Sequence, residues 1–160
     1  MLSTGNARSQ TPGLAKTMTR ARVLIVEDNT AFRALMADVL ALEGCKVTEA
    51  FDATSMRWHM RVRGLEEYPD EPFDLIITDI QMPGESGLIS LEWLRLRGCP
   101  IPVVVVTSFP ELTTQAQVNR LSATLLPKPF SLNDFRAAAL AALRAHGRNT
   151  RGGSAKLTFR

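Results

Sequence analysis

Short apolar segments that alternate with amphipathic segments constrain the fold of this chain most strongly. Strands are predicted at Val23–Val26, Lys46–Ala50, Phe73–Thr78, Pro102–Val106 and Ala123–Leu126. Helices are predicted at Thr30–Glu43, Ala53–Arg63, Leu88–Arg97, Glu111–Leu121 and Ser131–Ala145. Five strand–helix units in succession predict an α/β fold, in which a doubly wound, five-stranded parallel sheet is flanked by five helices.

The helical segments show which side chains we expect to face the core. In the first helix Phe32, Leu35, Met36, Val39 and Leu40 recur at helical spacing and predict one buried face. Trp58 and Trp93 are expected at the core or the edge of their own helices. Pro102–Val106 contains a continuous β-branched run, which is typical of a central parallel strand buried on both faces.

Length and composition favour one globular domain. The chain has 160 residues, of which 45% are hydrophobic and 22% charged, and these are ordinary values for a domain with a real core. No segment approaches the roughly 20 apolar residues that a membrane span needs. Cys45 and Cys99 have no motif spacing, so we expect a reduced protein in the cytoplasm.

The net charge of +3 comes from the two ends of the chain. Residues 1–20 are predicted to form a disordered basic N-terminal tail, and residues 147–160 a basic C-terminal tail or linker. The domain between them, residues 21–146, is mildly acidic. The tails lack the interleaved aromatic residues of single-strand binders, so we interpret them as solubilising ends.

Polar side chains that could bind a ligand or take part in a reaction follow four of the predicted strands. Glu27 and Asp28 follow the first, Asp79 the third, Thr107 the fourth, and Lys128 comes shortly after the fifth. Because the carboxyl ends of parallel strands form the ligand crevice, these side chains are expected to converge. Three carboxylates suit a hard divalent cation, and a lysine with a threonine hydroxyl suits a phosphoryl group.

These residues, in this order, resemble the receiver domain of two-component response regulators. The resemblance covers about Arg22 to Ala145 and rests on the strand-end residues together with Met82-Pro83, Gly87 and Lys128-Pro129-Phe130. It implies a flavodoxin-like fold with strand order 2-1-3-4-5 and a cis bond between Lys128 and Pro129.

The resemblance also implies a role for each site residue. Asp79 would accept the phosphoryl group, and Asp79, Thr107 and Lys128 would be the catalytic set. Mg²⁺ would be bound by Asp28, Asp79 and the backbone carbonyl of Gln81, with Glu27 acting mainly through water. Such a protein is not an enzyme for other substrates: it catalyses only its own phosphorylation on aspartate and the slow loss of that group.

The implied partners are a sensor histidine kinase or a phosphotransfer protein, and a downstream protein that the sequence does not identify. No DNA-binding module fits the residues after the fifth helix, and no membrane association is expected. A phosphorylation-dependent homodimer through the fourth helix and fifth strand is left open.

Two departures from the family pattern stand out. Leu125 occupies the position three before the lysine, where the family usually has an aromatic switch residue coupled to Thr107. Leucine cannot hydrogen-bond as tyrosine does, so the signal at this switch is expected to differ. The connection before the third strand, through Gly64–Glu71, is longer than usual.

Three other functions compete with a phosphorylated receiver. A degenerate receiver would act as a phosphorylation-independent binding module. A phosphohydrolase with an aspartyl nucleophile usually carries a second Asp two residues on, and here that residue is Gln81, which cannot transfer a proton. A nucleotide-binding domain would need a glycine-rich loop after the first strand, where Glu27-Asp28-Asn29-Thr30 stands instead.

Overall fold

The computed structural model describes residues 20–62 and 72–150. Its strands are β1 (Arg22–Val26), β2 (Lys46–Ala50), β3 (Leu75–Asp79), β4 (Val103–Thr107) and β5 (Thr124–Pro127). Its helices are α1 (Thr30–Leu42), α2 (Ala53–Arg61), α3 (Gly87–Leu96), α4 (Leu112–Arg120) and α5 (Leu132–Thr150). Residues 1–19 of the predicted N-terminal tail, the connection Gly64–Glu71 and residues 151–160 lie outside the described residues.

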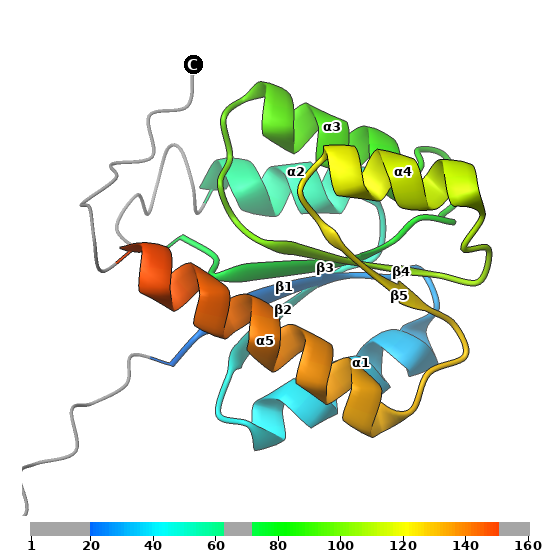
Figure 1. The fold of residues 1–160 in the computed structure, drawn as a ribbon. Helices are drawn as coiled ribbons and strands as arrows, with labels where there is room; N and C mark the ends of the chain where they lie inside the picture. The colour runs from blue at the N-terminus through cyan, green and yellow to red at the C-terminus, as the bar shows by residue number, and fades with distance from the viewer. Residues whose placement is uncertain (1–19, 63–71, 151–160) are drawn as a thin grey trace, which may run out of the picture.

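The strands form one parallel sheet in the order β2-β1-β3-β4-β5, which confirms the predicted topology. Helices α2, α3 and α4 cover one face of this sheet, and α1 and α5 cover the other (Figure 1). The register pairs Val26 of β1 with Thr78 of β3, and Asp79 with Val106 of β4. The residues that follow these strands therefore emerge side by side at one edge of the sheet.

The core consists of two apolar layers, one on each face of the sheet. Every residue of β3 and of β4 is buried, as predicted for the β-branched run of β4. Alternate residues of each strand point to opposite layers, so Ile76 belongs to one layer and Ile77 to the other. The sheet is thus held from both sides, and its carboxyl edge is a rigid platform.

Side-chain caps fix where the helices begin at that edge. The Asn29 side chain accepts a hydrogen bond from the Phe32 N–H at the start of α1. Asp52 and Ser55 form a reciprocal capping box at the start of α2, and Ser86 caps α3. Each cap satisfies a backbone donor that the first turn of a helix leaves free.

Three expectations were wrong in detail. Trp58 is 60% exposed and stacks edge-on against His59, because it lies two positions from Met56 and so on the opposite side of α2. Leu35 is 42% exposed, beside the buried face of α1 that contains Met36 and Leu40. Helix α5 continues past Ala145 to Thr150, into the range expected to be the C-terminal tail. None of the helices in the described part of the chain could cross a membrane.

Candidate functional site

Asp79 is the last residue of β3, the central strand of the sheet. Its side chain lies at the carboxyl edge and is 6% exposed as a whole residue. The backbone behind it is tightly packed: a Cβ atom on Gly87 would lie 2.0 Å from the Asp79 carbonyl oxygen. Only glycine fits there, and this explains why Gly87 follows the loop Met82–Ser86 at the start of α3.

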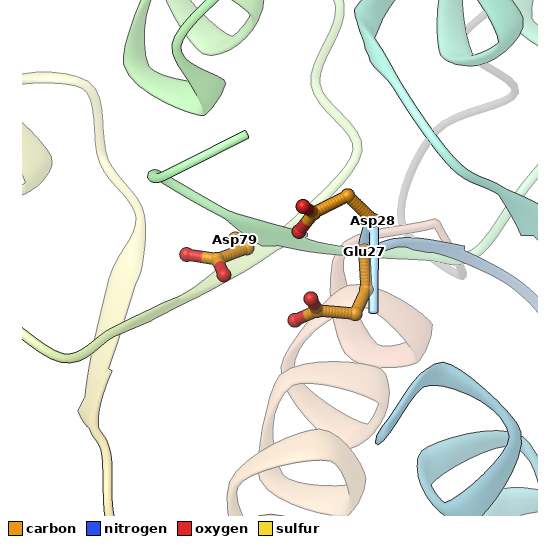
Figure 2. A group of neighbouring side chains, drawn as sticks. All are labelled: Glu27, Asp28 and Asp79. Carbon is orange, nitrogen blue, oxygen red and sulfur yellow. The ribbon is translucent and has the colours of Figure 1, made fainter. Parts of the chain in front are cut away.

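Three carboxylates meet at this edge. Glu27 and Asp28 follow β1, which neighbours β3, and one oxygen from each of Glu27, Asp28 and Asp79 lies within 4.8 Å of the others. Figure 2 shows the Glu27 and Asp28 carboxylates turned toward the side on which Asp79 lies. Glu27 is buried, whereas Asp28 is exposed, so the cluster opens to solvent on the Asp28 side. Oxygen ligands of this kind, accessible from one side, fit a hard divalent cation such as Mg²⁺.

Lys128 supplies the positive charge of the site. Its Nζ donates to Asp79 Oδ2 at 2.8 Å and to Glu27 Oε2 at 3.0 Å. The ammonium also lies 4.6 Å from the centre of the Phe32 ring. The Lys128–Pro129 bond is cis, as the resemblance implied. One lysine, directly after the edge strand β5, thus reaches the carboxylate that follows β1 and the one that ends β3.

For each of Glu27 and Lys128, burial shifts the pKa in one direction, and their mutual contact shifts it in the other. Burial raises the pKa of the Glu27 carboxyl, although the Asn29 N–H and Lys128 oppose this effect. Burial alone would lower the pKa of Lys128, but its hydrogen bonds to Asp79 and Glu27 outweigh it and raise that pKa above the ordinary value. Lys128 therefore stays charged beside the carboxylates.

Thr107 is the last residue of β4 and is buried. Its hydroxyl oxygen accepts a hydrogen bond from the Phe109 N–H at 3.1 Å, and its carbonyl accepts one from the Lys128 N–H at 2.7 Å. Thr107 and Lys128 are thus adjacent through their backbones. Phe109 itself is 56% exposed in the loop that leads to α4.

The remaining predicted residues occupy two different places. Gln81 lies two residues after the end of β3, and its backbone N–H donates to Asp79 Oδ1 at 2.9 Å. Leu125 lies in β5 opposite Val105 and is half-buried against the core layer beneath α4, so it does not belong to the carboxylate cluster. The structure therefore brings together Glu27, Asp28, Asp79, Gln81 and Lys128, with Thr107 beside them.

Sequence reasoning missed two residues of α1 that contact this site. Phe32 lies under the Lys128 ammonium, and Arg33 donates to the Glu27 carbonyl oxygen. A cavity of about 480 Å³ adjoins Lys128 and is lined by Phe32, Ser108, Lys128, Pro129 and Phe130. Their position in the sequence could have indicated this role, because both residues lie in the first turn of the helix that follows the acidic pair.

Comparison with known proteins identifies the family of this chain. The family model of the response regulator receiver domain matches residues 23–140. A probable transcriptional regulatory protein of Picosynechococcus is 35% identical over 133 residues, which are 81% of this chain and 52% of that protein. The transcriptional activator protein PfeR of Pseudomonas aeruginosa is 35% identical over 124 residues, covering 77% of this chain and 38% of that protein. The chain thus spans about half of these curated relatives or less.

Solved structures show the same fold. A CheY-like receiver domain protein from Methanospirillum hungatei aligns with a TM-score of 0.71 at 24% identity, covering 82% of this chain and 99% of that one. The receiver domain of a LuxO repressor protein from Vibrio parahaemolyticus aligns equally well, with a TM-score of 0.71 at 21% identity over 82% of this chain and 96% of that one. Because the family model covers most of the chain, this protein belongs to the response regulator receiver domain family of two-component systems.

Proposed function

We propose that this domain accepts a phosphoryl group on Asp79 in a Mg²⁺-dependent reaction and signals through the surface around α4 and β5. The observation that carries the proposal is the contact set of Asp79. Its carboxylate lies at 2.8 Å from the Lys128 ammonium and within 4.8 Å of two further carboxylates. A carboxylate nucleophile surrounded by charge compensation is the arrangement that covalent phosphoryl transfer needs.

In the proposed reaction an Asp79 oxygen attacks phosphorus, and the bond from phosphorus to the donor atom breaks. The donor is a phosphohistidine of a sensor histidine kinase or phosphotransfer protein, and the product is an acyl phosphate. Bound Mg²⁺ would compensate the charge of the phosphoryl oxygens, held by Asp28, Asp79 and the Gln81 carbonyl, with Glu27 acting mainly through water. The protein would perform only this transfer and the slow hydrolysis of the acyl phosphate, in which water attacks phosphorus and releases inorganic phosphate and the Asp79 carboxylate, and so is not proposed as an enzyme for other substrates.

The signal would begin at Lys128 and Thr107. Lys128 would exchange its contact with the Asp79 carboxylate for one with a phosphoryl oxygen, and the Thr107 hydroxyl would donate to the same group. Reorientation of that hydroxyl would break the hydrogen bond that it now accepts from the Phe109 N–H. The loop between β4 and α4 would then move, so that a local charge change reaches the α4 surface. Leu125 would follow this movement by packing, because it has no polar group.

The test is phosphorylation by a small donor. The protein is incubated with Mg²⁺ and acetyl phosphate or phosphoramidate, and its mass is measured beside that of the Asp79→Asn variant. A single phosphoryl adduct on the wild type, absent from the variant and from a sample in EDTA, is expected. No adduct on the wild type would overturn the proposal and favour a degenerate receiver that binds its partner without phosphorylation.

A further inference from the structure

Arg33, in the first turn of α1, makes two contacts that the proposed reaction does not use. Its Nη1 donates to the carbonyl oxygen of Glu27 at 2.6 Å. Its Nε donates to Oε2 of Glu49, on β2, at 2.9 Å. The Arg33 side chain is only 12% exposed, whereas the Glu49 side chain is 46% exposed, so the guanidinium is largely buried while its pair with Glu49 reaches solvent. A planar guanidinium can hold two acceptors in a fixed relation, which a lysine cannot do.

With the contact from Arg33, every polar group of Glu27 has a hydrogen-bond partner, and the backbone after β1 is held in place. The Glu27 N–H donates to the Ala50 carbonyl on β2 at 3.1 Å, as a last rung of the sheet. The Glu27 carboxylate accepts from the Asn29 N–H at 3.0 Å. Arg33 holds the remaining polar group of this residue, the carbonyl, which belongs to the peptide unit that links Glu27 to Asp28.

Asp28 depends on this peptide unit more than its neighbours do. Its carboxylate is exposed, and within residues 20–62 and 72–150 no hydrogen bond to that carboxylate is found. Asp79, in contrast, is fixed by Lys128 and by the Gln81 N–H. The direction in which the Asp28 side chain leaves the backbone is therefore set by the backbone alone.

We infer that Arg33 is a positioning residue for the metal site: it orients the Glu27–Asp28 peptide so that the Asp28 and Asp79 carboxylates face the same divalent cation. Glu49 holds the guanidinium in place and offsets its charge. This inference rests on the proposed function, because it assigns a role toward the Mg²⁺ that the function requires. Outer ligands that orient a metal-binding residue commonly change metal affinity by about 10- to 100-fold when removed.

Charge and positioning predict opposite results, which makes the inference easy to test. A guanidinium near a cation site repels the cation, so a purely electrostatic role means that removing Arg33 strengthens Mg²⁺ binding. A positioning role means that removing it weakens binding, because Asp28 loses its fixed direction.

The measurement is Mg²⁺ binding to the whole protein by isothermal titration calorimetry, without any phosphodonor. We expect Arg33→Ala to raise the Kd for Mg²⁺ about tenfold. Arg33→Lys keeps the charge but loses the two-acceptor geometry, and is also expected to raise the Kd. The matched control is Arg136→Ala, which removes another arginine–glutamate pair, with Glu43, between α5 and the end of α1. It should leave the Kd unchanged.

Urea denaturation in EDTA establishes that each variant is folded before it is titrated. An unchanged or lower Kd in Arg33→Ala overturns the positioning role. Should that variant fail to fold, an unchanged Kd in Arg33→Lys overturns it equally. If the wild type itself binds no Mg²⁺, the metal site of the proposed function fails, and this outcome is distinct from a wild type that binds while the variants bind equally well.

Discussion

Among single residues, Glu27 is a carboxylate whose surroundings oppose its own charge. Burial raises its pKa, and the nearby Asp79 carboxylate acts in the same direction, against the Asn29 N–H and Lys128. The folded protein therefore binds a proton at Glu27 more readily than the unfolded chain does. This contribution to stability is fully present below the unfolded pKa and is lost as the pH rises through the folded one.

Glu27→Gln should consequently stabilise the fold at neutral pH in the absence of Mg²⁺. The amide is nearly isosteric, keeps an oxygen for the Asn29 N–H and carries no charge to desolvate. We expect a higher urea midpoint than the wild type at pH 7.5 in EDTA, and a difference that shrinks as the pH falls toward the ordinary pKa of glutamate. Glu111→Gln, at an exposed position without a side-chain cap, is the control. A lower midpoint throughout would show that the Lys128 contact outweighs burial.

Gly87 is a second residue whose position tolerates no larger side chain. A Cβ there would lie 2.0 Å from the Asp79 carbonyl oxygen and 3.0 Å from Thr78 Oγ1, and the nearer contact is with backbone that cannot rotate away. Gly87→Ala should lower the free energy of unfolding by about 3 kcal/mol. In Gly147→Ala the new Cβ meets nothing within 4 Å in α5, and a gain of about 0.5 kcal/mol is expected. Urea denaturation measures both, and equal effects would refute the steric argument.

Three helices are followed by a residue in the left-handed backbone conformation, which suits some residue types better than others. Left-handed residues follow α1, α3 and α4: Gly44 with φ +81°, Gly98 with φ +71° and Ser122 with φ +52°. Glycine adopts this conformation at no steric cost, whereas a side chain is strained in it. Ser122 is therefore the unfavourable member of the three.

Ser122→Gly should raise the free energy of unfolding by about 1 kcal/mol, since relief of the left-handed strain exceeds the added flexibility of the unfolded chain. The reciprocal change is Gly98→Ser, where a Cβ meets nothing within 4 Å and only backbone strain is introduced. It should cost a similar amount. Thermal or urea unfolding of both variants is the check, and a loss in Ser122→Gly would mean that its side chain contributes a contact of its own.

Sequence reasoning placed the elements because apolar periodicity and strand-end chemistry are local signals. It failed for Trp58 for a local reason, because helical geometry sets this residue opposite Met56 and so away from the core. It also failed where a distant neighbour in the structure decides. Arg33 was overlooked because its role depends on Glu49, which only the pairing of β1 with β2 brings near. The strand-end residues were found because a parallel sheet aligns its carboxyl ends regardless of such detail.

Across the whole molecule, the two apolar layers pack on opposite faces of one sheet. Unfolding of the strands would therefore expose both layers together. We expect a single cooperative unfolding transition. Mg²⁺ that binds the folded carboxylate cluster should raise the free energy of unfolding by about 2.7 kcal/mol at a concentration 100 times its Kd.

Urea denaturation with Mg²⁺ and with EDTA measures this increment. The Asp28→Asn variant, which keeps the shape of the side chain but loses its charge, should lose most of the increment while still unfolding in one step. Equal midpoints for the wild type in both solutions would contradict a metal site at this edge.

The long reach of Lys128 has a consequence for how the protein is made. The lysine contacts Glu27, a hundred and one positions earlier in the chain, and it does so from the position directly after β5, the edge strand of the sheet. A nascent or truncated chain that ends before β5 would contain all three acidic residues but no ammonium to balance them. If the proposed function holds, a chain could accept a phosphoryl group only after the last strand has joined the sheet.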